Sequence, residues 1–167
     1  RHLFTMTHGI PGISALEIGG LRALPIPIDQ WYETTSKKPL EYTPGEKFKY
    51  LNAGYTVLGL IIERVSGKSY GEFMQENIFT PLGMNRTGYE DPLRIIKNRA
   101  IGYKQLPGDP ITNVPYREII RMYAAGGIYS TTEDLLIWDQ VLYTDKLFSK
   151  KSIDEMFTPF REMVPGR

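Results

Sequence analysis

Glycine and proline interrupt this chain so often that it can form few long elements. The 167 residues include 16 glycines and 12 prolines, and proline breaks a helix interior while glycine weakens it. The clearest helical periodicity runs from about 52 to 66, where one face holds Gly54, Val57, Leu58, Ile61, Ile62 and Val65. We predict a mainly α chain with long loops and few strands, in which this helix is the most buried element.

Capping residues predict the shorter helices. A Ser followed three residues later by Glu satisfies two backbone N–H groups at a helix start. This pattern occurs at Ser69-x-x-Glu72 and Ser130-x-x-Glu133, and the first of these helices should stop before Pro81. Asp29 and Ser149 are the predicted caps of two further short helices. A short strand and a helical turn are also expected, at 100–104 and 116–123 respectively.

Composition and charge exclude several classes of function. Twenty Lys and Arg against nineteen Asp and Glu leave a net charge of +1, which does not favour nucleic-acid binding. The absence of cysteine excludes disulfides, thiolate metal sites and a cysteine nucleophile. Two histidines are too few for a histidine-based metal site, and no cofactor is expected.

Length and hydropathy favour one globular unit without a membrane segment. The longest apolar run, Val57–Ile62, is far shorter than the roughly 20 residues that span a bilayer. The length suits a single domain, or a subdomain of a larger one, covering residues 1–167.

The segment before the long helix places two polar side chains together. Pro44 and Gly45 predict a tight turn, from which an extended aromatic stretch leads to the helix. Tyr50 and Asn52 are two residues apart on that stretch, so both side chains point the same way. A phenol and a carboxamide directed at one point could form a polar site. The alternative is structural, with Asn52 capping the helix and Tyr50 packing beside it.

Three other local motifs are weaker indicators of function than the segment around Tyr50 and Asn52. Gly67-Lys68-Ser69 resembles the end of a phosphate-binding loop, but Ile62 stands where that loop begins with glycine, and a helix rather than a strand precedes it. Asn85-Arg86-Thr87 is a glycosylation sequon of a kind that often arises by chance. His8 is interpreted as a turn residue because no metal-ligand partner stands at suitable spacing.

Four blocks, Leu3–Pro11, Pro44–Tyr55, Phe79–Thr87 and Ala124–Leu135, occur in order along the chain. They resemble the His-Thr-Ser-Gly, Tyr-x-Asn, Pro-Leu-Gly-Met and Ala-Gly-Gly segments of the class C β-lactamase-like serine hydrolases. That family includes penicillin-binding D-Ala-D-Ala carboxypeptidases, class C β-lactamases and related esterases. The first block departs in one detail, because His8 stands where the family has Ser.

The resemblance implies a fold and a partial catalytic site. The chain resembles the helical subdomain of the β-lactamase/transpeptidase-like α+β fold, lacking most of the sheet. Family members attack an amide, lactam or ester with a serine and pass through an acyl-enzyme. By resemblance, Tyr50 would be the catalytic proton shuttle and Asn52 would bind substrate.

The other two catalytic motifs of the family are missing from this sequence. No Ser-x-x-Lys occurs, and Thr34-x-x-Lys37 lies on the wrong side of the His8-Gly9 block. Lys/His-Thr/Ser-Gly does not occur either. We therefore expect that the chain is a fragment and that the nucleophile is not in it.

Two functions stay open at this point. The chain is a fragment of a serine hydrolase whose parent acts on a small-molecule or peptide substrate, or it is a non-catalytic helical binding or scaffold module derived from that family. A Ser-x-x-Lys encoded upstream of Arg1 would favour the hydrolase. The isolated chain is expected to be inactive and to self-associate through an exposed apolar face. The resemblance favours an extracytoplasmic location, while the substrate stays undetermined.

Overall fold

The computed structural model describes residues 1–12, 28–91, 94–113 and 119–160. These residues fall into two compact units. One unit holds Arg1, residues 60–89 and the chain from 128 onward, and the other holds residues 2–59 and 90–127. The beginning of the helical turn predicted at 116–123 lies outside the described residues.

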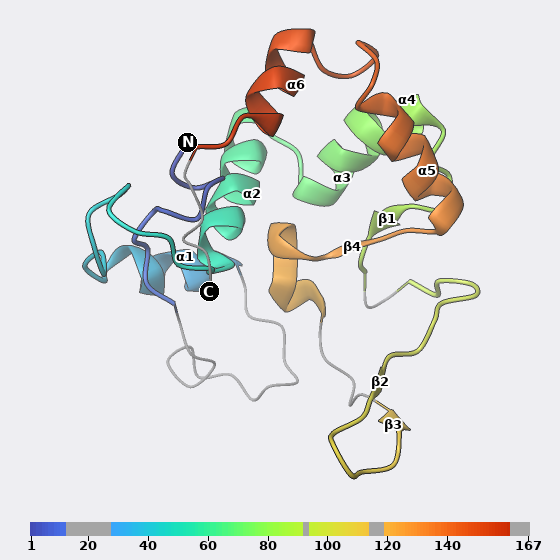
Figure 1. The fold of residues 1–167 in the computed structure, drawn as a ribbon, viewed down its shortest axis with the longest axis horizontal. Coiled ribbons are helices and arrows are strands. Elements are labelled where there is room, and N and C mark those ends of the chain that lie inside the picture. Colours follow the sequence, from blue (N-terminus) through green and yellow to red (C-terminus); the bar gives the residue numbers. More distant parts are fainter. Residues whose placement is uncertain (13–27, 92–93, 114–118, 161–167) are drawn as a thin grey trace. The chain divides into compact units, whose positions relative to one another are not determined.

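The unit of residues 2–59 and 90–127 contains little regular structure. Its helices are α1 (Ile28–Ser36), the first part of α2 (Ala53–Ser66) and the 3-10 helix η2 (Ile119–Ala125). Strands β2 (Tyr103–Lys104) and β3 (Thr112–Asn113) pair antiparallel in an exposed hairpin (Figure 1). The strand predicted within 100–104 is confirmed as β2.

The unit of residues 60–89 and 128–160 carries most of the helices. After the second part of α2 come α3 (Tyr70–Met74), the π-helical segment η1 (Gln75–Phe79) and α4 (Thr80–Leu82). Strands β1 (Gly88–Tyr89) and β4 (Ile128–Tyr129) pair antiparallel, and α5 (Thr132–Val141) and α6 (Lys150–Phe157) follow. The prediction of a mainly helical chain with few strands is confirmed for the described residues.

The core of this second unit is built from a few large side chains. Tyr70, Phe79, Met84 and Val141 are all buried. The ring of Tyr70 meets that of Tyr89 edge to face, with centroids 5.6 Å apart, a favoured aromatic arrangement. This packing places β1 against α3.

Helix α2 has the predicted bounds, but of its predicted apolar face only Gly54 is buried. Its buried residues are the small ones, Ala53, Gly54, Thr56 and Gly59, whereas Ile61 is 47% exposed. The small residues are buried because other side chains approach the helix backbone closely there, as the contacts of Gly54 and Gly59 show below. None of the described helices combines the length and apolar character that crossing a bilayer requires.

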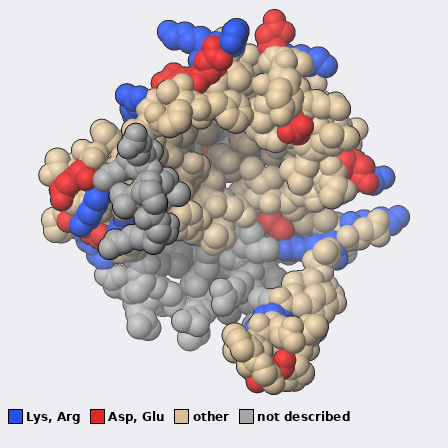
Figure 2. All heavy atoms as spheres, in the orientation of Figure 1, with Lys and Arg blue, Asp and Glu red and all other residues tan. Residues whose placement is uncertain are grey.

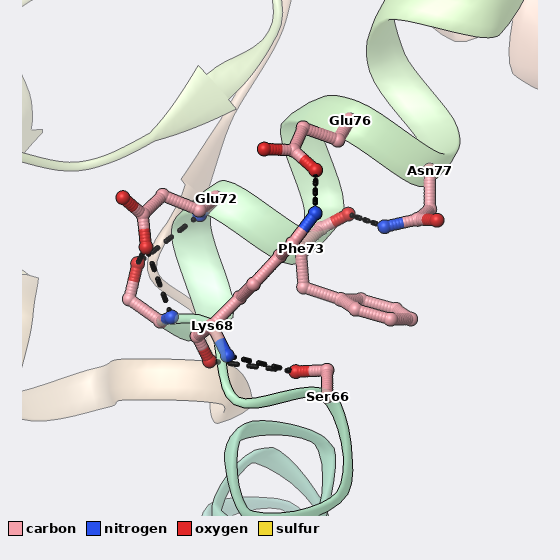
Figure 3. A network of polar contacts seen from close by, with 7 residues as sticks. Ser66, Lys68, Glu72, Phe73, Glu76 and Asn77 are labelled. Carbon is pink, nitrogen blue, oxygen red and sulfur yellow. Dashed lines mark hydrogen bonds and ion pairs between the residues drawn. The ribbon is translucent and has the colours of Figure 1, made fainter.

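The capping predictions are confirmed at two helices and wrong at two others. Asp29 does not precede α1 but lies in its first turn, because α1 begins at Ile28. Ser69 and Glu72 form the predicted capping box, next to an ion pair between Lys68 and Glu76 (Figure 3). Ser149 caps α6 by accepting a hydrogen bond from the amide of Ser152. At α5 the cap is Thr131, not Ser130, because the Thr131 hydroxyl reaches the Asp134 amide at 3.3 Å.

The helix that begins at Tyr70 does not stop before Pro81, as the sequence predicted. The chain widens into the π-helical segment η1, where the Thr80 amide donates to the carbonyl of Gln75. Pro81 then lies in the first turn of α4, where its missing N–H costs no helical hydrogen bond. Gly83 ends the run in a left-handed conformation with φ 74°.

Candidate active site

Backbone hydrogen bonds join the block around His8 to the segment that leads to Tyr50. Three amides of the later segment donate to carbonyls of the earlier one at 2.8 to 3.0 Å: Glu41 to Gly9, Gly45 to Thr7 and Lys49 to Met6. Because the last of these pairs directly precedes Tyr50, the approach to the predicted site is fixed by main-chain contacts.

Glycine at position 9 is required by this arrangement. Its φ of +70° is one that side chains other than glycine rarely adopt. A Cβ there would also lie 2.2 Å from the carbonyl oxygen of Tyr42, which is far inside van der Waals contact. Gly9 therefore allows the two segments to approach each other closely.

His8 is buried and packs against the start of α2. A Cβ on Gly54 would lie 2.6 Å from Cδ2 of the His8 ring, so only glycine leaves room for it. Nδ1 of His8 accepts a hydrogen bond from the Ile10 amide at 2.9 Å, which places the proton of the neutral ring on Nε2. Nε2 is buried and makes no hydrogen bond of good geometry to the described residues. The turn residue predicted from sequence is thus also a packing residue.

Burial favours the neutral form of this histidine. It lowers the pKa of His8 below its ordinary value, an effect opposed by the backbone of Leu51 and the carboxylate of Glu41. The hydrogen bond that Lys49 donates to the Glu41 side chain lowers the pKa of Glu41, so that carboxylate is charged at neutral pH.

Tyr50 lies open to solvent at the end of the joined segment. Its side chain is 67% exposed, which excludes the alternative that it packs beside the helix. Its neighbour Lys49 forms an ion pair with Glu41. An exposed phenol held on a fixed backbone is accessible to a substrate or to another catalytic group.

Asn52 begins α2 through its main chain. Its carbonyl accepts hydrogen bonds from the amide and the hydroxyl of Thr56, at 2.9 and 3.2 Å. Its side-chain amide does not bond to the helix backbone: Nδ2 donates to Sδ of Met122 at 3.9 Å. The predicted role as a helix cap is therefore filled by the backbone of Asn52, while its carboxamide contacts a residue 70 positions away.

Met122 and Tyr123 were not identified from the sequence. Tyr123 has φ 42° and ψ −132°, a combination that residues other than glycine rarely adopt. A Cβ on Gly59 would lie 2.5 Å from its ring, so Tyr123 packs directly onto α2. Backbone strain leaves no signature in a single sequence, and nothing there links Met122 to Asn52.

The side chains of Tyr50 and Asn52 are chemically suited to proton transfer and to hydrogen bonding, respectively. A phenol can carry a proton and a carboxamide can bind an amide. Among the described residues, no three His, Cys, Asp or Glu side chains gather in a way that could hold a metal ion.

Comparisons with known proteins identify the family. The family model described as Beta-lactamase matches residues 1–164. Penicillin-binding protein 4* of Bacillus subtilis (strain 168) is 34% identical over 178 residues, which cover 96% of this chain and 39% of that protein. The chain thus spans about two fifths of the length of two curated relatives that it matches along almost its whole sequence.

Two solved structures resemble the fold. A penicillin-binding protein from Bacillus halodurans has a TM-score of 0.78 at 26% identity, covering 96% of this chain and 51% of that one. An octameric penicillin-binding protein homologue from Pyrococcus abyssi has a TM-score of 0.77 at 32% identity, covering 99% and 39%. With the family model matching almost the whole sequence, the chain belongs to the beta-lactamase family.

Proposed function

We propose that this chain is part of a serine hydrolase that cleaves an amide, lactam or ester through an acyl-enzyme. The observation that carries the proposal is the exposed phenol of Tyr50, held two residues before Asn52 at the start of α2. The beta-lactamase family membership and the likeness to penicillin-binding proteins support the same chemistry.

Tyr50 is proposed to move a proton between the serine, the leaving group and a lysine. A phenol has an ordinary pKa near 10, so it acts as a base at neutral pH only beside positive charge. Lys49 forms an ion pair with Glu41, so its positive charge is already compensated. The charge is proposed to come from the lysine of a Ser-x-x-Lys motif, which the 167 residues do not contain.

Asn52 is proposed to bind the substrate and the lysine beside the serine. A carboxamide can donate from Nδ2 and accept at Oδ1, so it can hold an amide group and an ammonium group together. Asn52 directly precedes α2, and its carbonyl accepts hydrogen bonds from both the amide and the hydroxyl of Thr56. These bonds hold the backbone of Asn52 in place. Rigid support of this kind is what a binding group requires.

Acylation by a fluorescent penicillin tests this proposal. The protein that carries this chain together with a Ser-x-x-Lys serine is expected to form a covalent adduct and to lose it when that serine is replaced by alanine. The 167-residue chain alone is expected not to label. Absence of an adduct, together with no hydrolysis of a reactive ester, would contradict the hydrolase; labelling of the isolated chain would contradict the absence of a nucleophile.

The chain is also proposed to self-associate through exposed apolar side chains. Figure 2 shows charges of both signs interspersed with uncharged surface on the visible face. Several large apolar residues on and before the β2–β3 hairpin are more than half exposed: Ile95, Ile101, Tyr103, Leu106 and Ile111. A homologue of known structure is octameric. Sedimentation at several concentrations tests this, and a monomer whose mass does not change with concentration would contradict it.

A further inference from the structure

The side-chain amide of Asn52 has a defined partner. Nδ2 lies 3.9 Å from Sδ of Met122, a distance suited to the large sulfur atom. A thioether sulfur accepts hydrogen bonds weakly and cannot donate them. The amide nitrogen of Asn52 is therefore the end that faces Met122, and Oδ1 is turned away from the sulfur.

The side chain of Met122, which is 38% exposed, has Gly126 as a second neighbour. A Cβ on Gly126 would lie 3.3 Å from Cε and 3.4 Å from Cβ of Met122, so glycine at 126 leaves the methionine its space. The amides of Gly126 and Gly127 both donate to the Tyr123 carbonyl, at 3.3 and 2.8 Å. These bonds close the backbone from 123 to 127 into a tight turn directly after Met122.

Tyr123 fixes this turn to the helix that Asn52 begins. Its strained backbone persists only where surrounding contacts hold it. The buried ring supplies that contact, because it packs against the backbone of Gly59 on α2. Met122 and Asn52 thus both belong to a structure anchored on α2.

We propose that Met122 is a positioning residue that holds the Asn52 carboxamide in one orientation. The inference rests on the proposed function, in which Asn52 binds the amide group of the substrate. One N–H of Nδ2 is directed at the sulfur, which leaves the second N–H to donate to the carbonyl of the substrate amide and Oδ1 to accept from the lysine. The segment just before the Ala-Gly-Gly block then supports the Tyr-x-Asn block through Met122.

Substitution of Met122 in the active protein tests the role. Met122→Leu keeps the bulk of the side chain and removes the hydrogen-bond acceptor. Because a weak hydrogen bond is lost, kcat/KM is expected to fall about three- to tenfold, mainly through a higher KM. That loss is expected for a substrate with an amide carbonyl beside the scissile bond, with a change of less than about twofold for a simple ester lacking that amide. Met122→Gln restores an acceptor and is expected to recover activity on the amide substrate. Met156→Leu on α6 is the matched control.

A measurement without substrate separates this inference from the proposed function. In asparagine-labelled protein, the Asn52 side-chain N–H signals, assigned by their loss in Asn52→Asp, should shift and exchange faster with water in Met122→Leu but not in Met156→Leu. Unchanged Asn52 signals, or equal activity losses on both substrates, would overturn the role of Met122. Shifted signals in a protein that hydrolyses neither substrate would leave the contact standing and contradict the hydrolase.

Discussion

Oδ2 of Asp134 accepts a hydrogen bond from the hydroxyl of Thr87 at 2.7 Å, across 47 residues of sequence. The same oxygen accepts from the Arg86 amide at 2.8 Å, and Ser130 lies 2.7 Å from the Thr87 hydroxyl. Thr87 ends the Pro-Leu-Gly-Met block and Asp134 lies in the Ala-Gly-Gly block. The two sequence blocks are therefore physically joined, and this junction gives both of them a structural role apart from catalysis.

Replacing Asp134 should destabilise the fold. Asp134 and Thr87 are both 5% exposed, so Asp134→Ala leaves a buried hydroxyl and a backbone N–H without their acceptor. A buried polar group left unpaired costs about 1–3 kcal/mol, so a loss of roughly 2–3 kcal/mol in unfolding free energy is expected. Urea titration measures it. Asp139→Ala on the exposed side of α5 is the control. Equal stability of the two variants would mean that the junction contributes nothing.

Local patterns predicted elements better than they predicted contacts. The bounds of α2 and the Ser69–Glu72 capping box follow from short-range spacing, which depends only on neighbouring residues. Which face of α2 is buried depends on residues from distant segments. His8 and Tyr123 come close to Gly54 and Gly59, and no periodicity within the helix encodes their approach.

The site was predicted only in part for the same reason. Tyr50 and Asn52 stand close in sequence, so their common direction follows from strand geometry and family resemblance. Met122 lies 70 residues from Asn52. Its contact with Asn52 depends on a backbone conformation at Tyr123 that residues other than glycine rarely adopt. Strain of this kind is visible only in a structure.

Gly59→Ala should destabilise the chain although alanine is the better helix former. Helix propensity favours alanine by about 1 kcal/mol, whereas overpacking costs about 1–3 kcal/mol. The new Cβ would lie 2.5 Å from the Tyr123 ring and 2.6 Å from Cβ of Ala124, both of which must move. Overpacking is expected to prevail, so thermal unfolding should occur at lower temperature. Val65→Ala, at a position 82% exposed on the same helix, should not lower it; a more stable Gly59→Ala protein would contradict the packing.

Tyr50→Phe should reduce turnover and leave stability almost unchanged. In the active protein, loss of a positioned proton-transfer group costs about 10²–10⁴-fold in kcat. The phenol is 67% exposed, so its hydroxyl contributes little to folding. Steady-state kinetics on a reactive ester measure the effect, with Tyr143→Phe, 80% exposed, as the control. Activity of Tyr50→Phe within twofold of the unmodified protein would remove Tyr50 from the mechanism.

His8 should make the fold less stable in mild acid. Burial lowers its pKa below the ordinary value near 6.5, so the unfolded chain binds a proton more readily than the folded one. Unfolding free energy should therefore fall as pH drops from about 7.5 to about 5.5, a range above that in which most carboxylates titrate. His8→Asn places Oδ1 where Nδ1 accepts from the Ile10 amide but does not titrate, so it should flatten this dependence. His2→Asn, at an exposed position, should leave it intact. A slope that survives in His8→Asn would assign the acid sensitivity to another group.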